Sequence, residues 1–141
     1  MRIGDVARQA GTTPRTIRYY EEIGLLEASG ERPSGAHREY TEADVERLRE
    51  ILRFRDLLGV SLDELRDLMA AEDARAAIRE EFRRTEDPGR RAELLRTALG
   101  HLDRQLALVH RRQDELAALE GDLAERRARV VARLAGDPVS A

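Results

Sequence analysis

Apolar residues near the start of the chain recur every three or four positions, which is the spacing of one face of an α-helix. The first group comes before Gly11 and consists of Ile3, Val6, Ala7 and Ala10. Thr13 and Pro14 then favour a helix start. The threonine hydroxyl can accept a hydrogen bond from a free amide of the first turn, and the amide hydrogen that proline lacks would be unpaired at the first helical position in any case. This second helix should run from about Pro14 to Glu22. Two short helices joined by a tight turn predict a helix-turn-helix.

The next segment, Ala28–Glu39, is rich in glycine, proline and charged residues and predicts a hairpin or loop. Two further helices should begin at Thr41 and Ser61. Each is followed three positions later by an acid that can complete a capping box, Asp44 and Glu64 respectively. Their apolar stripes indicate core residues and consist of Val45, Leu48, Leu52 and Leu58, then Leu62, Leu65, Leu68 and Met69.

The last pattern is a long helix. A charged helical stretch from about Asp73 to Arg84 precedes it, Asp87–Pro88 should begin it, and Gly136–Asp137–Pro138 should end it. Uninterrupted, it would be about 70 Å long. Its seam has the four-three spacing of a coiled coil and is polar at Gln113, Glu120 and Arg127. The expected dimer contacts are Leu95, Leu99, Leu102, Leu106, Val109, Leu116 and Leu123.

A helix with this stripe would expose its leucines to water, so a second copy of the chain is the simplest partner. Gly100 and Gly121 each weaken a helix, and a break or a hairpin near Gly121 is an open alternative.

Composition narrows the function. Of the 141 residues 38% are charged and 4% are aromatic, which is typical of long solvated helices and not of a large catalytic core. The net charge is −3, but four arginines and one acid lie between Met1 and Tyr20, so a basic surface is expected locally. There is no cysteine, which excludes disulfides and thiolate metal sites. No segment resembles a signal peptide or a membrane span, so we expect a cytoplasmic protein with no membrane partner.

The segment Ala7–Leu26 resembles the helix-turn-helix of the mercury-resistance-regulator (MerR) family, above all in the run Arg18-Tyr19-Tyr20-Glu21 followed by Gly24-Leu25. Arg38-Glu39-Tyr40-Thr41 resembles the exit of that family's wing, and residues 58–65 resemble the helix pair of its second wing. The resemblance covers Met1 to about Met69, and beyond it only the layout agrees. It implies a mainly α protein with a winged helix-turn-helix followed by a long dimerisation helix, which forms an antiparallel coiled coil.

The same resemblance implies a homodimer that binds double-stranded DNA at a promoter. In the family the dimer sits between overspaced promoter elements, bends and untwists the DNA, and thereby acts indirectly on RNA polymerase. The chain divides accordingly into a winged helix-turn-helix at 1–70, a helical connector at 71–87, a coiled-coil helix at 88–135 and a flexible tail at 136–141. The inducer, if there is one, is unknown.

The second helix is the expected reading element, because a major groove about 12 Å wide admits one helix. Its exposed side should present Arg15, Thr16, Arg18 and Tyr19, while Tyr20 lies partly in the core. Arg18 could contact a guanine edge or a phosphate; the alternative is a surface ion pair with Glu21 or Glu22. Further DNA contacts are expected in the wing, from Arg32, His37 and Arg38. Others are expected from Arg53, Arg55 and the helix start at Ser61. Tyr40 should anchor the wing to the body.

No cofactor, metal site or enzyme activity is expected. His101 and His110 are nine residues apart, so they do not share the face of a helix that a zinc pair would need. The sequence carries no nucleophile elbow and no phosphate-binding loop. Two alternatives to a transcription regulator stay open. One is an architectural or excision-type DNA-binding protein, and the other is a coiled-coil interaction protein that does not read DNA sequence.

Overall fold

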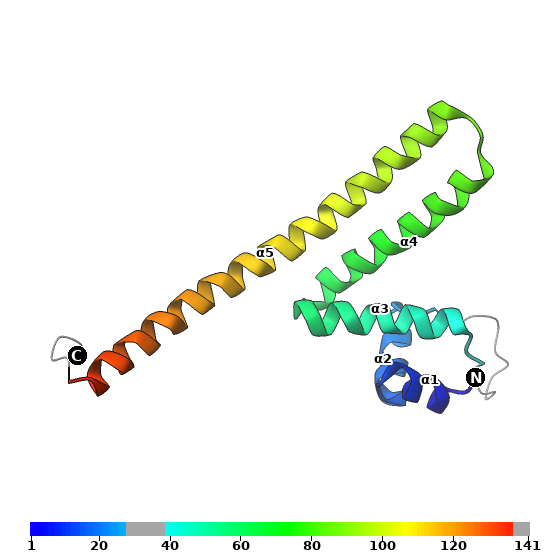
Figure 1. Ribbon diagram of the computed structural model, residues 1–141. Helices are drawn as coiled ribbons and strands as arrows, with labels where there is room; N and C mark the ends of the chain where they lie inside the picture. The colour runs from blue at the N-terminus through cyan, green and yellow to red at the C-terminus, as the bar shows by residue number, and fades with distance from the viewer. Residues whose placement is uncertain (28–38, 137–141) are drawn as a thin grey trace.

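The computed structural model describes residues 1–27 and 39–136, and these form five α-helices and no β-strand (Figure 1). In order, the helices are α1 Ile3–Ala10, α2 Pro14–Glu22, α3 Glu42–Leu58, α4 Leu62–Arg84 and α5 Pro88–Leu134. Helices α1 and α2 pack beneath α3, whereas α4 and α5 form a long antiparallel hairpin beside them. The second half of α5 extends beyond the rest of the molecule (Figure 1).

Local sequence signals explain the helix-turn-helix. Gly11 ends α1 with a φ of 71°, a left-handed conformation that glycine adopts without a steric penalty. The Thr13 hydroxyl oxygen accepts a hydrogen bond from the Thr16 amide at 3.2 Å, and Pro14 occupies the first position of α2. The predicted bounds of both helices are therefore confirmed.

The predicted capping boxes of α3 and α4 are also confirmed. The Asp44 amide donates to the Thr41 hydroxyl at 3.2 Å, and the Thr41 amide donates to the Asp44 carboxylate at 2.8 Å. Ser61 and Glu64 form the equivalent pair, with distances of 3.2 and 3.0 Å. Each box satisfies two backbone amides that a helix start leaves unpaired.

One hydrophobic core joins α1, α2, α3 and the beginning of α4. Its fully buried side chains come from all four helices and from the segment after α2, and include Val6, Ile17, Leu26, Val45, Leu48, Ile51 and Met69. The predicted stripes of α3 and α4 contribute Val45, Leu48, Leu52, Leu65 and Met69 to this core; Leu62 packs against it and Leu58 is half-buried. This core fixes the position of α2 relative to α3 and α4.

Helix α4 continues without interruption from this core to Arg84, so no helix end separates the core from the charged stretch. The boundary between residues 70 and 71 thus lies within a helix, and the division into domains remains a prediction. The rest of α4 packs along α5, a contact that the sequence did not predict. Leu94 of α5 is buried there, the Arg91 guanidinium lies 3.9 Å from the centre of the Phe82 ring, and the Gln105 side-chain amide donates to the Leu68 carbonyl at 3.3 Å.

Helix α5 is continuous through Gly121, so the alternative of a break or hairpin at that residue is not realised. Within the described residues it ends at Leu134, just before Gly136 with its φ of 86°; Asp137 and Pro138 lie outside them. The predicted seam does not face α4. Of its residues only Val109 is half-buried, whereas the exposed ones are Leu95, Leu99, Leu102, Leu106, Leu116 and Leu123.

Candidate nucleic-acid interface

Helix α2 separates a buried face from an exposed one. Ile17 and Tyr20, three positions apart, are 0% and 3% exposed and pack in the core. Arg15, Arg18 and Tyr19 lie on the opposite side and are exposed, while Thr16 is half-buried. The spacing of three and four residues places the exposed side chains along one stripe of the helix. Helix α2 therefore presents two arginines and a tyrosine outward from a rigid support.

The adjacent tyrosines divide as the sequence predicted. Tyr19 is 48% exposed and Tyr20 is buried, with their ring centroids 5.6 Å apart. The Tyr20 hydroxyl is not left unpaired in the core, because the Arg55 guanidinium donates to it at 3.2 Å. The core position of Tyr20 is confirmed. The assignment of Tyr19 to DNA remains a prediction.

Arg18 makes no ion pair or hydrogen bond with any residue that the structure describes. The alternative in which Glu21 or Glu22 holds its guanidinium is therefore not realised. An unpaired guanidinium on an exposed helix face can donate to a guanine edge or to a phosphate. Arg15 is in the same situation.

Two arginines, from α3 and α4, donate hydrogen bonds to the turn that follows α2, and the sequence did not indicate either of them. Arg47 of α3 donates from Nε to the Leu25 carbonyl at 3.1 Å, and its guanidinium also pairs with Asp73 of α4. Arg66 of α4 donates to the Ile23 carbonyl at 3.3 Å. A helix end leaves carbonyls without partners, and these arginines supply donors for the turn that follows α2. Because the contacts span 22 and 43 residues, no local pattern indicates them.

The start of α4 is the second candidate contact region. Ser61 is exposed and caps the helix, and the Ser61 amide lowers the pKa of Glu64 by donating to its carboxylate. Arg53 of α3 is exposed and has no partner among the described residues. Arg55 donates instead to Asp56 at 2.8 Å and to Tyr20. Arg53 is thus the free cation of this region, whereas Arg55 is occupied with protein groups.

The predicted wing contacts Arg32, His37 and Arg38 lie outside the described residues. The segment that follows them is anchored: Tyr40 is 5% exposed, its amide donates to the Met1 carbonyl at 2.8 Å, and its hydroxyl donates to Glu21 of α2. The chain therefore re-enters the core next to α1 and α2. Tyr40 is thus held by the core, and its predicted role of anchoring the wing stays a prediction.

Comparison with known proteins agrees with this geometry. The family model described as "MerR HTH family regulatory protein" matches residues 1–72, which include α1, α2, α3 and the core-forming part of α4. The chain belongs to the MerR family. It is thus a DNA-binding transcription regulator of the helix-turn-helix type, as its relatives are.

Two relatives show how far the similarity extends. The HTH-type transcriptional regulator YfmP of Bacillus subtilis is 38% identical over 109 residues, which are 77% of this chain and 77% of that protein. The HTH-type transcriptional activator TipA of Streptomyces coelicolor is 41% identical over 109 residues, 76% of this chain but 38% of TipA. A crystal structure of a MerR-family transcriptional regulator from Bacillus cereus has a TM-score of 0.53 at 22% identity. The match covers 100% of this chain and 86% of the Bacillus cereus chain. That likeness supports the fold.

Two further findings concern the described residues alone. None of the helices there is long and apolar enough to cross a membrane. Within the same residues no group of three or more histidine, aspartate and glutamate side chains is placed to hold a metal ion.

Proposed function

We propose that this MerR protein acts as a homodimer, binds a pseudo-palindromic promoter site and bends or untwists it. The observation that carries the proposal is the pairing of two unsatisfied surfaces. Helix α2 presents Arg15, Arg18 and Tyr19 outward, with no ion pair or hydrogen bond from either arginine to the described residues, and α5 presents a row of exposed leucines. DNA completes the first surface and a second copy completes the second.

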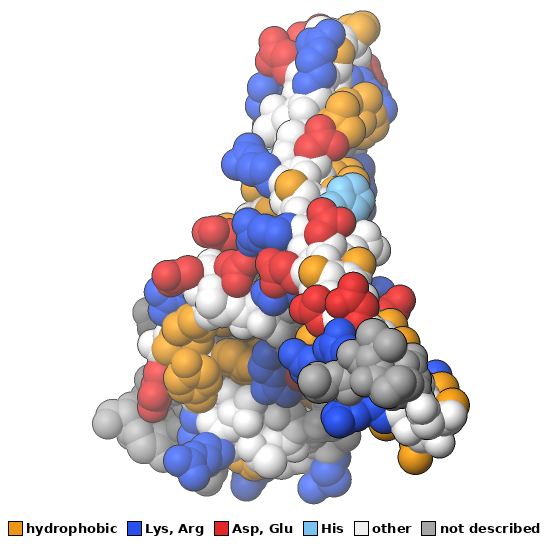
Figure 2. Space-filling view, turned by 90° about the vertical axis from the view of Figure 1, so that its left-hand side faces the viewer, with side chains coloured by type: hydrophobic (Ala, Val, Ile, Leu, Met, Phe, Trp, Pro, Cys, Tyr) orange, Lys and Arg blue, Asp and Glu red, His pale blue; other side chains and the backbone are white. Residues whose placement is uncertain are grey.

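The exposure of α5 supports the proposed dimer. Leu95, Leu99 and Leu106 are 57%, 58% and 49% exposed, although Leu94 on the same stretch of the helix is 4% exposed. Figure 2 shows hydrophobic side chains at the surface of the column that α4 and α5 form. Burial of a leucine contributes about 1.5–3 kcal/mol, so a seam of several such residues suffices for a stable dimer.

An antiparallel arrangement suits the shape of the molecule. Helix α4 covers only the first half of α5, and none of the other described helices lies beside the second half (Figure 1). In an antiparallel pair, the exposed second half of one α5 lies on the seam of the first half of the other. Val130 and Leu134, 58% and 84% exposed, would then be covered near Leu95 and Leu99 of the partner subunit. Each α5 would thus cover the part of the other that α4 leaves open.

Two copies of α2 would enter successive major grooves, which are about 34–36 Å apart along one face of the duplex. The start of α4 and Arg53 would contact phosphates on either side of each groove, and Arg38 would extend this footprint through the wing. A wide set of phosphate contacts can offset a bending cost of about 1–6 kcal/mol. The wing and the α4 start, rather than α2, would therefore control the distortion of the DNA.

A salt titration tests sequence reading. Affinity for the DNA upstream of the gene is compared with affinity for a shuffled duplex between about 50 and 200 mM salt, over which phosphate-dominated binding weakens strongly. The proposal predicts a preference for the upstream duplex of about 10³ or more. Equal affinity for the two duplexes at every salt concentration would leave an interaction protein that does not read sequence.

Circular-permutation mobility or energy transfer between the DNA ends tests the distortion in the same complexes. A bend should appear with the parent protein and should decrease in Arg38→Ala, whereas Arg129→Ala, a charge-matched change at an exposed position of α5, should leave it unchanged. Straight DNA in the saturated parent complex would leave a regulator that acts only by occupying its site.

A further inference from the structure

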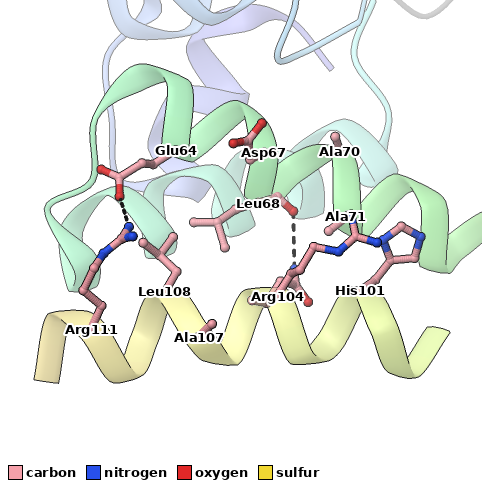
Figure 3. A pocket seen from close by; sticks show the side chains of 11 residues that line it. Glu64, Asp67, Leu68, Ala70, Ala71, His101, Arg104, Ala107, Leu108 and Arg111 are labelled. Carbon is pink, nitrogen blue, oxygen red and sulfur yellow. Dashed lines mark hydrogen bonds and ion pairs between the residues drawn. The ribbon is translucent and has the colours of Figure 1, made fainter. Parts of the chain in front are cut away.

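The α4–α5 hairpin has an open cleft of about 500 Å³ on one flank (Figure 3). Leu68 and Ala71 of α4 and Leu108 of α5 provide its apolar lining. His101, Arg104 and Arg111 of α5 provide its basic groups. Small-molecule sites in proteins are commonly clefts of about 300–1,000 Å³ that combine an apolar lining with a few polar groups.

One of the two arginines that line the cleft has no protein partner among the described residues. Arg104 is exposed and makes no ion pair or hydrogen bond with any residue that the structure describes. Its side chain extends toward the His101 end of the cleft, while the Asp67 carboxylate is directed away from α5 (Figure 3). Glu64 is at the other end and is occupied, because Arg111 donates to it at 2.7 Å and the Ser61 amide donates to it at 3.0 Å. At the His101 end the Arg104 guanidinium is therefore unpaired among the described residues, while the Glu72 carboxylate is engaged by the Gln105 side-chain amide at 2.9 Å and by Arg75.

The proposed dimer would not cover this cleft. Arg104 is two positions from Leu102 and two from Leu106, which on an α-helix is a rotation of about 200°. The exposed leucine seam and the cleft thus lie on opposite flanks of α5. A second groove, lined by Ile78, Phe82 and Leu102, lies on the seam side and belongs to the dimer surface.

We propose that this cleft binds a small organic anion with an apolar body, such as an aromatic or aliphatic carboxylate. Its acidic group would accept hydrogen bonds from Arg104 and His101, and its body would lie on Leu68 and Leu108. Guanidinium groups bind carboxylates with two parallel hydrogen bonds, which gives such a site orientation as well as affinity.

Occupancy of the cleft would reach the DNA-binding surface through one residue. Glu64 joins the capping box of α4 to Arg111 of α5, and Leu108 lies next to Arg111 in the cleft, so a ligand body seated on Leu108 would perturb that ion pair (Figure 3). The α4 start is the proposed phosphate contact, and this regulatory consequence therefore rests on the proposed function. Binding of the anion in the cleft is independent of the proposed function.

Magnetic resonance of the full chain tests binding without DNA, with 2-naphthoate as the probe. The sequence has no asparagine and three glutamines, so each side-chain amide is assignable; Gln105 lines the cleft, while Gln9 and Gln113 do not. We expect naphthoate to shift the Gln105 amide saturably and to leave the other two in place. The neutral 2-naphthamide should not saturate the site at the same concentrations.

Variants separate this site from general binding to exposed leucines. Arg104→Gln should weaken naphthoate binding about tenfold, the effect of losing one hydrogen bond to a charged group. Arg96→Gln, at an exposed arginine of α5 outside the cleft, should bind like the parent. An unmoved Gln105 amide, equal binding of the amide and the anion, or unchanged affinity in Arg104→Gln would each overturn the proposal.

The regulatory half has its own readout. Saturating naphthoate should shift the Ser61 backbone amide and change the affinity for the upstream DNA, and both effects should be lost in Arg104→Gln. If naphthoate saturates the Gln105 shift while DNA affinity stays constant, regulation through Glu64 is wrong and the binding site stands. If the parent protein shows no preference for the upstream DNA at all, the failure lies in the proposed function.

Discussion

The helix-turn-helix and the long helix α5 obtain their stability in different ways. Val6, Ile17, Leu48 and Ile51 are 0% exposed in a core that one chain completes. The seam of α5 leaves Leu95, Leu99 and Leu106 about half exposed on a helix of 47 residues. The difference shows that the first region completes its core within one chain, whereas the seam of α5 is left uncovered, as the proposed dimer requires. Substitutions in the two regions should therefore have distinguishable consequences.

The largest effect is expected at the seam. Replacing Leu102 and Leu106 together with alanine should cost about 4 kcal/mol or more if both become buried in the dimer. Sedimentation at micromolar concentration should then show a monomer. Leu57→Ala, at a leucine of α3 that is 69% exposed and outside the seam, serves as the matched control. Unchanged sedimentation of the double variant would show that the seam is assigned to the wrong face.

A core substitution should act on folding rather than on association. Ile17→Ala removes a fully buried side chain beneath α2 and should lower the free energy of unfolding by about 2–5 kcal/mol. Urea denaturation followed by circular dichroism measures the loss, and sedimentation under native conditions should still show the dimer. If Ile17→Ala instead gave a monomer with the unfolding midpoint of the parent, the core would serve association rather than folding, contrary to the proposal.

Substitution of a single exposed arginine of α2 should change the affinity for DNA. Arg18→Ala should weaken binding to the upstream DNA by about 1–3 kcal/mol and reduce its preference over shuffled DNA, because a base contact carries specificity. Fluorescence anisotropy with both duplexes measures the two affinities, and Arg129→Ala again matches the charge. An equal loss on both duplexes would identify Arg18 as a phosphate contact.

The cap of α2 should have a smaller effect. Thr13→Ala removes the acceptor for the Thr16 amide and should cost about 1 kcal/mol of stability. Thr13→Ser keeps a hydroxyl in the same place and should recover most of the loss. Urea denaturation compares the three proteins. A serine variant as unstable as the alanine variant would show that the hydrogen bond is not the cause.

The smallest effect is expected from Glu64 and depends on pH. Its pKa lies below the ordinary value, chiefly because the Ser61 amide donates to the carboxylate. A carboxylate whose pKa falls on folding stabilises the protein above its unfolded pKa, near 4.3, and loses that contribution as the pH falls through the folded value. The difference in urea midpoint between the parent and Glu64→Gln should therefore shrink from pH 7 to pH 3. A difference that stays constant over this range would contradict the assignment.

Sequence analysis succeeded where the signals were local. The bounds of α2 follow from Thr13, Pro14 and the apolar spacing, and the buried position of Tyr20 follows from a 100° step along a helix. The caps at Thr41 and Ser61 are equally local, because donor and acceptor are three residues apart.

Contacts between distant segments could not be predicted in this way. Helix α5 carries two apolar faces, and periodicity alone does not show which one faces α4. The structure shows that Leu94 and Gln105 face α4, while the heptad seam lies exposed on one flank of the α4–α5 pair. The arginines behind α2, Arg47 and Arg66, likewise depend on the packing of three helices, since each meets a carbonyl far away in the sequence.

The stoichiometry of the DNA complex tests the central claim most directly. Sedimentation velocity of the parent protein with a labelled duplex from upstream of its gene, at saturation, gives the mass of the complex. Two chains per duplex are predicted, and the Leu102→Ala/Leu106→Ala variant should lose that complex at the same concentration. The account would be contradicted if the saturated complex held one chain per duplex and the parent and the double variant had equal affinity for the DNA.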